Sequence, residues 1–214
     1  MYKKKPFFIV FEGIEGCGKS YQAKKLYKGL IKKGFSSILT REPGGTQSAE
    51  KIRDLILKDY FSKESKEKFD KYTDTLLYLA ARNEHIQNKI KPALIKKKIV
   101  ICDRFVDSTL AYQVYGKKVS KQFIHHIHKF ILKNIKPDLN FVLKVNVNSA
   151  SKRLKKRRVK NRYDKFPQAF YTKAQNSFLK IAKNKKNYYV FDSSLNTNAL
   201  EEKILKTVLK KLNK

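Results

Sequence analysis

The sequence has few cysteines, no tryptophan, few acidic residues and no long hydrophobic run. Its two cysteines, Cys17 and Cys102, exclude a disulfide-stabilised secreted domain and favour a reducing, cytoplasmic setting. The longest apolar runs, such as 7–11 and 99–102, are far shorter than a membrane-spanning helix, so we expect no membrane partner. The chain does not open with a basic and then apolar leader that ends in small residues, which argues against secretion.

Basic residues outnumber acidic ones by 50 to 18, which gives a formal net charge of +32. A hydrophobic content of 41% excludes a disordered polycation, and 214 residues suffice for one domain, 1–214, with its own core. The lysines are spread over nearly the whole chain, and only 152–162 is dense in basic residues. We therefore interpret the charge as surface composition and do not expect nucleic-acid binding to be functional. A polyanion-binding surface is the alternative.

Short apolar runs alternate with longer stretches of helical periodicity. Continuous apolar runs predict buried strands over 7–11, 37–40, 99–102, 139–145 and 188–191. Apolar residues at helical spacing predict helices over 19–33, 49–57, 72–90, 121–134, 149–156, 170–182 and 199–212. Strands separated by helices imply right-handed crossovers, so we predict an α/β fold with a five-stranded parallel sheet and helices on both faces.

The strongest motif follows the first predicted strand and reads Gly-Ile-Glu-Gly-Cys-Gly-Lys-Ser over 13–20. It matches the phosphate-binding loop (P-loop) pattern Gly-x4-Gly-Lys-Ser/Thr. Glycines let successive backbone N–H groups turn inward around an anion, and the next helix points its positive end at the phosphates. We therefore predict a P-loop NTPase fold that binds ATP through Gly13, Ile14, Glu15, Gly16, Cys17, Gly18, Lys19, Ser20 and Tyr21.

A magnesium site is expected beside this loop. In P-loop proteins the lysine, here Lys19, reaches the β- and γ-phosphates, and the following hydroxyl, here Ser20, ligates Mg²⁺. The third predicted strand ends in Asp103, and an acidic residue at that place is the usual source of a second metal contact. We predict Mg²⁺ as the cofactor, with Ser20 and Asp103 as its residues.

Arginine is rare in this lysine-rich chain, so each arginine is a candidate for the two-pronged phosphate contact that lysine cannot make. Arg53, Arg82 and Arg104 lie in three segments that should end or pass near the carboxyl edge of the sheet, where ligands bind. Together they would hold a second phosphate opposite the ATP. A separate basic segment, 152–165, would form a short lid over the donor phosphates.

Several motifs stand in an order that resembles the bacterial thymidylate kinase family from end to end. They are the P-loop, Arg-Glu-Pro-Gly-Gly at 41–45, Leu-Leu-Tyr-Leu-Ala-Ala-Arg at 76–82 and Asp-Arg-Phe-Val-Asp-Ser-Thr-Leu-Ala-Tyr-Gln at 103–113. The last of these, with its Ala-Tyr-Gln, is the most specific. The resemblance implies the reaction ATP + dTMP → ADP + dTDP, on the fold of P-loop nucleoside monophosphate kinases and usually in a homodimer.

The resemblance also implies roles in the acceptor site. Tyr78 would stack on thymine, and Tyr112 would lie against the sugar and disfavour a 2′-hydroxyl. Thr109 and Gln113 would read the edge of the base. The residues that would hold the dTMP phosphate, or organise the acceptor side and its magnesium and water network, are Glu15, Glu42, Pro43, Arg53, Arg82 and Arg104.

Catalysis here needs positioning and charge rather than a general base, because the attacking phosphate oxygen is already ionised near neutral pH. The variable positions of the P-loop hold Glu15 and neither arginine nor lysine. The chain therefore resembles the branch of the family in which a lid arginine meets the transferring phosphoryl group. The residues predicted to stabilise that group are Lys19, Arg104, Arg153, Arg157 and Arg158.

Three alternative functions are kept. The nearest is a P-loop kinase for another nucleoside monophosphate or for a nucleoside, although the motifs at 76–82 and 103–113 favour thymidylate. The second is a nucleic-acid-dependent ATPase or a regulatory GTPase, motivated by the charge alone. The third is a basic binding module with a degenerate nucleotide site.

Three histidines, His125, His126 and His128, share one predicted helix. Two of them at helical spacing could hold a metal ion, but no cysteine or further ligand lies nearby in the sequence. We therefore expect these histidines on a solvated or interface surface.

Overall fold

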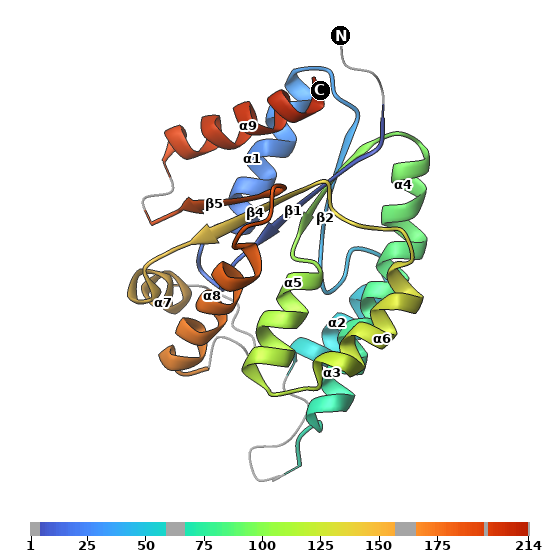
Figure 1. Ribbon diagram of the computed structural model, residues 1–214, viewed down its shortest axis with the longest axis vertical. Helices are drawn as coiled ribbons and strands as arrows, with labels where there is room; N and C mark the ends of the chain where they lie inside the picture. The colour runs from blue at the N-terminus through green and yellow to red at the C-terminus, as the bar shows by residue number, and fades with distance from the viewer. Residues whose placement is uncertain (1–4, 59–66, 157–165, 195–196, 214) are drawn as a thin grey trace.

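The computed structural model describes residues 5–58, 67–156, 166–194 and 197–213, and its centre is a parallel β-sheet (Figure 1). Every strand pairing in it is parallel. The central strand is buried along its whole length, as its continuous apolar sequence predicts. The predicted five-stranded parallel sheet is thus confirmed within the described residues. The strands lie in the order β2 (Ser37–Arg41), β3 (Ile99–Asp103), β1 (Phe7–Glu12), β4 (Leu139–Lys144) and β5 (Tyr188–Asp192).

Helices cover both faces of the sheet, as the handedness of the connections requires. The step from β1 to β2 crosses the sheet in one direction, and the later steps from β2 to β5 cross it in the other. Because such crossovers are right-handed, the first connecting helix lies on the opposite face from the later ones. The first face carries α1 (Lys19–Lys32) and α9 (Asn198–Leu212). The second carries α3 (Lys71–His85), η1 (Ile86–Ile90), α4 (Lys91–Ile95), α5 (Val106–Thr109), η2 (Leu110–Gly116) and α8 (Gln168–Ala182).

Three further helices pack on these elements. α2 (Gln47–Leu57) packs on α3, α6 (Lys121–Leu132) packs on α3 and η2, and α7 (Val147–Lys155) packs on α8. Within the described ranges, no helix combines the length and apolar character that a membrane crossing needs. The first turns of these three helices are capped by the side chains of Thr46, Ser120 and Asn146.

The helical prediction is incomplete in two places. The helix predicted over 72–90 is α3 followed by a π-helical turn, η1, and α4, which together reach Ile95. The sequence predicts no element over 106–116, where the structure has α5 and the π-helical segment η2. Residues such as Val106, Ser108 and Thr109 have low helix propensity, so contacts from elsewhere in the fold support this helix. One is the Glu12 carboxylate at the end of β1, which accepts the backbone N–H of Ser108 at 3.3 Å.

Candidate active site

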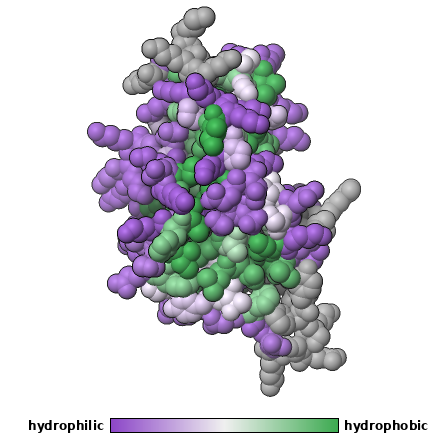
Figure 2. Space-filling model, turned by 90° about the vertical axis from the view of Figure 1, so that its right-hand side faces the viewer, coloured by the Kyte–Doolittle hydropathy of each residue, from purple (hydrophilic) through white to green (hydrophobic). Residues whose placement is uncertain are grey.

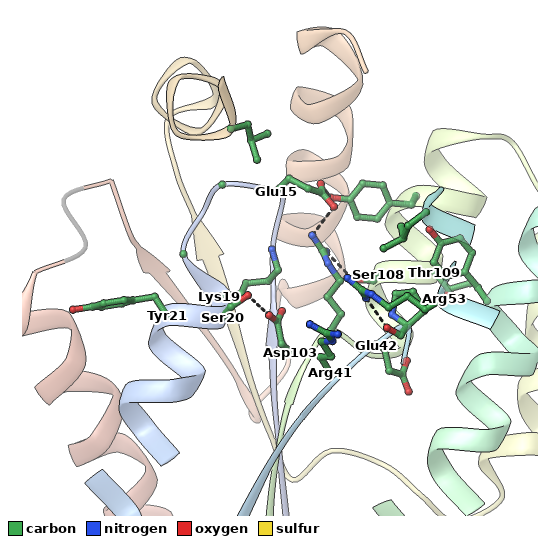
Figure 3. A pocket seen from close by; sticks show the side chains of 18 of the residues that line it. Glu15, Lys19, Ser20, Tyr21, Arg41, Glu42, Arg53, Asp103, Ser108 and Thr109 are labelled. Atoms are coloured by element: carbon green, nitrogen blue, oxygen red, sulfur yellow. Dashed lines mark hydrogen bonds and ion pairs between the residues drawn. The ribbon is translucent and has the colours of Figure 1, made fainter. Parts of the chain in front are cut away.

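The main pocket lies at the carboxyl edge of the sheet, beside the ends of β1, β2 and β3 (Figure 3). Its volume is about 530 Å³. This is the place expected for a ligand in a parallel sheet, where the chain leaves neighbouring strands in opposite directions. The predicted site residues that line the pocket are Glu15, Gly16, Gly18, Lys19, Ser20, Tyr21, Glu42, Pro43, Arg53, Tyr78, Arg82, Asp103, Arg104, Thr109, Tyr112, Gln113 and Arg153.

The remaining predicted residues do not line the pocket, and one residue that does, Tyr21, turns its hydroxyl elsewhere. Ile14 and Cys17 are fully buried, so their side chains support the P-loop from within the core. Gly13 contributes its carbonyl oxygen, which accepts a hydrogen bond from a pocket arginine. The side chain of Tyr21 points away from the cluster around Lys19, and its Oη donates to Glu201 on α9 at 2.7 Å (Figure 3). Arg157, Arg158 and most of the predicted lid over 152–165 lie outside the described residues.

The P-loop forms a positively polarised cradle between β1 and α1. Gly16 has a left-handed φ of 74°, and a Cβ at this position would lie 2.6 Å from the carbonyl oxygen of Ala150. The first turn of α1 contains no acidic residue, so its N–H groups keep their capacity to bind an anion. Lys19 is buried, and its Nζ donates to Ile14 O at 2.7 Å, so the ammonium group lies against the backbone of the P-loop.

Two residues that fit a divalent metal ion meet beside this loop. Ser20 Oγ, in the first turn of α1, donates a hydrogen bond to Asp103 Oδ2 at the end of β3 (Figure 3). The second carboxylate oxygen, Asp103 Oδ1, is buried and has no hydrogen-bond partner among the described residues. An unpaired buried carboxylate oxygen is costly, and oxygen ligands of this kind suit Mg²⁺. Ser20 and Asp103 therefore form a donor set that fits magnesium.

Arg104 lies between the P-loop and the far half of the pocket. Its guanidinium donates to Gly13 O at 2.8 Å, to Ser108 Oγ at 3.1 Å and to Glu15 Oε1 at 2.7 Å. It also lies over the ring of Tyr112, whose Oη donates to Glu15 Oε2. Burial opposes the charged form of Glu15, but Arg104 together with the P-loop lysine outweighs it and lowers the pKa of Glu15. Glu15 is therefore a carboxylate that holds Arg104 and Tyr112 in place.

Arg82, on α3, is held by partners from four other segments. Its Nε donates to Glu42 Oε2 at 2.8 Å, and its Nη2 donates to Phe105 O at 2.9 Å. Its Nη1 lies 2.8 Å from both Thr109 Oγ1 and His128 Nε2. A guanidinium has five N–H donors, so these contacts leave one without an acceptor among the described residues. In this arrangement Arg82 offers a ligand a single hydrogen bond and not a two-pronged one.

Glu42, directly after β2, is the buried anion of the same network. It is 6% exposed, and its Oε1 lies 3.1 Å from His85 Nδ1. His85 Nε2 in turn lies 2.6 Å from Thr40 Oγ1. Burial opposes ionisation of Glu42, but Arg82 and then His85 outweigh it and lower the pKa of Glu42. The charges of Glu42 and Arg82 are thus paired away from water, and removal of either would leave the other buried and unpaired.

The chamber beyond Arg104 combines an aromatic wall with an unpaired amide. Tyr78, one helical turn before Arg82 on α3, lines this chamber. Gln113 on η2 is 2% exposed, and its Nε2 has no hydrogen-bond partner in the described part of the chain. A buried amide donor beside an aromatic face fits a planar heterocycle that has a hydrogen-bonding edge. Arg53 on α2 donates from Nη1 to Pro43 O at 2.6 Å and adds positive charge to the pocket wall.

Of the predicted lid arginines, Arg153 lies within the described residues, whereas Arg157 and Arg158 do not. It comes from α7, and its Nη1 donates to Gly16 O at 3.1 Å. Its Nη2 donates to Ser194 O, after β5. Arg153 therefore joins α7 to the P-loop and lies on the pocket wall at that point.

Several residues of the site were missed by sequence analysis. Glu12 closes β1 beneath the pocket and accepts a hydrogen bond from Ser108 Oγ at 2.6 Å. Burial, followed by the nearby charge of Asp107, raises the pKa of Glu12 to about 7. The sequence does contain a signal for this residue, because Glu12 is a carboxylate at the end of an otherwise apolar predicted strand. The other pocket-lining residues without a predicted role are Arg41, Leu57 and Ser108, whereas Leu154 and Lys156 belong to the predicted lid segment 152–165.

The expectation for the histidines is wrong at one position. His125 and His126 are exposed, but His128 is buried and contacts Arg82. Ile124 and His128 lie one helical turn apart, so both fall on the inward face of α6. The helical spacing of this apolar residue and the histidine was the signal that could have found it.

Comparisons with known proteins agree on one family. A family model described as thymidylate kinase matches residues 11–204. The chain is 38% identical to the thymidylate kinase of Mycoplasma capricolum subsp. capricolum, over 96% of this chain and 95% of that protein. It is 43% identical to that of Wolbachia sp. subsp. Brugia malayi, over 83% of this chain and 82% of that protein. The crystal structure of thymidylate kinase from Ehrlichia chaffeensis superposes with a TM-score of 0.73 at 30% identity, covering 95% of this chain and 99% of that one.

Proposed function

Because the chain belongs to the thymidylate kinase family, we propose that this pocket transfers the γ-phosphoryl group of ATP to dTMP and yields ADP and dTDP. The observation that carries the proposal is one cavity lined by the P-loop and by Tyr78 and Gln113, in which Arg104 bonds both to the P-loop and to Ser108 on α5. A phosphate cradle lies on one side, and a chamber with an aromatic wall and a buried unpaired amide lies on the other. The cavity is large enough to bring the reacting groups of two nucleotides together.

In the donor half, we propose that the P-loop N–H groups and Lys19 bind the β- and γ-phosphates of ATP. The Lys19 ammonium would exchange its contact with Ile14 O for phosphate oxygens. Ser20 and Asp103 would hold Mg²⁺, which neutralises phosphate charge when bound. Arg153, already at the P-loop, would stabilise the transferring group, and Arg157 and Arg158 remain candidates for the same role.

In the acceptor half, we propose that Tyr78 stacks on the thymine ring and that Gln113 donates to its edge through the unpaired Nε2. Arg104 and Arg53 supply the charge for the dTMP phosphate. Arg82 adds one hydrogen bond and otherwise acts as the hub that fixes Glu42 and the start of α5. Tyr112, held by Glu15, would exclude a 2′-hydroxyl from the sugar site.

The proposed reaction needs no general base. The attacking oxygen belongs to a phosphate whose second pKa is about 6, so it is ionised at neutral pH. The protein therefore aligns the two phosphates and places positive charge around the transferring phosphoryl group. Two free cysteines, Cys17 and Cys102, both buried, agree with action in a reducing cytoplasm.

The direct test of this function is an ADP-release assay with ATP, Mg²⁺ and a panel of acceptors. The panel contains dTMP, dUMP, UMP, CMP, AMP, GMP and thymidine. We expect rapid turnover with dTMP, slower turnover with dUMP and almost none with UMP, because UMP carries the 2′-hydroxyl that Tyr112 would exclude. Turnover with another acceptor in place of dTMP would replace the proposed substrate. ATP hydrolysis stimulated by nucleic acid and by no nucleotide would point to a motor or binding function instead.

We also propose a homodimer that buries the outer faces of α3 and α6. Figure 2 shows apolar side chains gathered on the side of the molecule formed by these helices. Leu76 on α3 is 46% exposed and Phe130 on α6 is 65% exposed, and Tyr72 meets Phe123 edge to face between the helices. Copies with a charge of +32 repel each other, so an apolar face is the surface where two can meet. Sedimentation equilibrium should give twice the chain mass of 25.1 kDa; a monomer at every concentration would contradict this proposal.

A further inference from the structure

One residue connects α6 to the pocket. His128 is 6% exposed, and its Nε2 lies 2.8 Å from Arg82 Nη1, the nitrogen that also bonds Thr109 Oγ1. The other three partners of Arg82 come from the loop after β2, the loop after β3 and α5. Among the described residues, His128 is the one contact that α6 makes with this guanidinium.

We propose that His128 is a positioning residue for the acceptor nucleotide, which acts by fixing the guanidinium of Arg82 in the acceptor chamber. This inference rests on the proposed function of the pocket as a dTMP site. His128 does not line the cavity itself, so it acts through Arg82 and not on the substrate.

The chemistry of the contact determines the protonation of His128. A guanidinium has donors and no acceptor, so Nε2 must accept the hydrogen bond and the ring proton must sit on Nδ1. The imidazole is therefore neutral. Burial, followed by the charges of Arg82 and His125, lowers the pKa of His128 to about 3, which agrees with a neutral ring. The contact thus persists over the whole pH range in which the enzyme would work.

The consequence of losing this acceptor falls on one side of the pocket. Without His128, an N–H of Arg82 Nη1 would be buried with no partner, and the guanidinium would turn to recover one. That turn would disturb its bond to Thr109, which belongs to the acceptor chamber. Within the described residues, Lys19 in the donor half bonds to Ile14 O and Ser20 bonds to Asp103 Oδ2, so neither bonds to Arg82 or His128. The effect should therefore appear in the binding of dTMP and not of ATP.

The experiment compares four variants of the full chain by steady-state kinetics with dTMP and ATP. His128→Leu fills the space but removes the acceptor, and His128→Asn keeps an amide that is too short to reach Arg82. His128→Gln places an amide oxygen near the position of Nε2. Lys206→Leu, at an exposed position on α9 that does not line the pocket, is the surface control.

We expect His128→Leu and His128→Asn to raise the KM for dTMP by about ten-fold or more, the effect of one lost hydrogen bond to a charged group. The KM for ATP and kcat should change by less than about three-fold. His128→Gln should restore most of the dTMP affinity, and Lys206→Leu should behave as the wild type. Thermal unfolding of each variant checks that it folds; if His128→Leu does not, His128→Asn and His128→Gln carry the comparison.

Three results would overturn this role. The first is an unchanged KM for dTMP in both His128→Leu and His128→Asn. Lower stability with an unchanged KM would mean that His128 has a structural role alone. The second is equal impairment of His128→Gln and His128→Leu, which would mean that ring shape and not the acceptor matters. The third is a parallel rise in the KM for ATP. A wild-type enzyme that does not phosphorylate dTMP would overturn the proposed function and this inference with it.

Discussion

Replacing Arg104 by leucine is expected to lower kcat/KM for dTMP by about a thousand-fold, since it removes a charged group that faces both halves of the pocket. Arg104 makes three hydrogen bonds, to Gly13 O, Ser108 Oγ and Glu15 Oε1, and its guanidinium covers the ring of Tyr112. The substitution therefore removes the charge for the acceptor phosphate and releases the side chains that shape the sugar site. Arg104→Lys keeps the charge but cannot form the fork, so it should remain impaired by about a hundred-fold.

The same substitution should destabilise the fold in a pH-dependent way. In the wild type, Arg104 lowers the pKa of Glu15 against the effect of burial, so the pair adds stability above pH 4.5, the ordinary pKa of the carboxyl group. That contribution is lost as the pH falls through the lowered pKa of Glu15. In Arg104→Leu the buried carboxylate has lost its main partner, so the loss of Tm should be larger at pH 7 than at pH 4. Glu15→Gln in the same chain should recover stability but not activity.

These expectations are checked by steady-state kinetics and by thermal unfolding at the two pH values. Lys32→Leu is the surface control, since Lys32 is exposed in the last turn of α1 and does not line the pocket. Activity of Arg104→Leu within about ten-fold of the wild type would show that Arg104 does not face the reacting phosphates. Equal destabilisation at both pH values would contradict the pairing with Glu15.

The second large effect is expected for Lys19→Met, which should lower kcat by about a hundred- to a thousand-fold. Methionine has nearly the length of lysine, and Lys19 is 5% exposed, so the variant should fold with a similar core. What is lost is the ammonium group, now held by Ile14 O at 2.7 Å, which would move to the phosphates of ATP. Because this charge acts on the transferring phosphoryl group, kcat should fall more than the affinity for dTMP.

Initial rates of dTDP formation, together with dTMP binding by calorimetry, measure both quantities. Lys24→Met is the matched control, since Lys24 lies on the same helix, α1, and is exposed. Retention of more than about a tenth of the wild-type kcat in Lys19→Met would remove the P-loop lysine from the reaction. A large loss of dTMP affinity would place its effect in the acceptor half and contradict the division of the pocket.

The parts of the site that the sequence predicts are those whose physics is local. The P-loop is a contiguous run of eight residues after an apolar strand, so glycine spacing alone indicates its conformation. Asp103 is predictable for the same reason, since it ends a strand whose neighbour carries the loop. The parallel sheet also follows from local patterns, because apolar runs and helical periodicity alternate with handed crossovers.

The network around Arg82 could not be predicted in this way. Its partners Glu42, Phe105 and His128 lie 23 to 46 residues away and meet only after the sheet and α6 are packed. In the folded chain, four of the five N–H donors of Arg82 have partners among the described residues, so one donor is left for a ligand. The sequence alone favours a two-pronged phosphate contact at this arginine. The helix over 106–116 was missed because a carboxylate from β1 supports residues with little helix preference of their own.

Direct passage of one phosphoryl group between two nucleotides in this pocket is tested by following the label of [γ-³²P]ATP in the presence of Mg²⁺ and unlabelled dTMP. We expect one label in dTDP for each ADP formed, and no transfer without dTMP. Label released as inorganic phosphate at the same rate with and without dTMP, or found in another acceptor but not in dTDP, would contradict it.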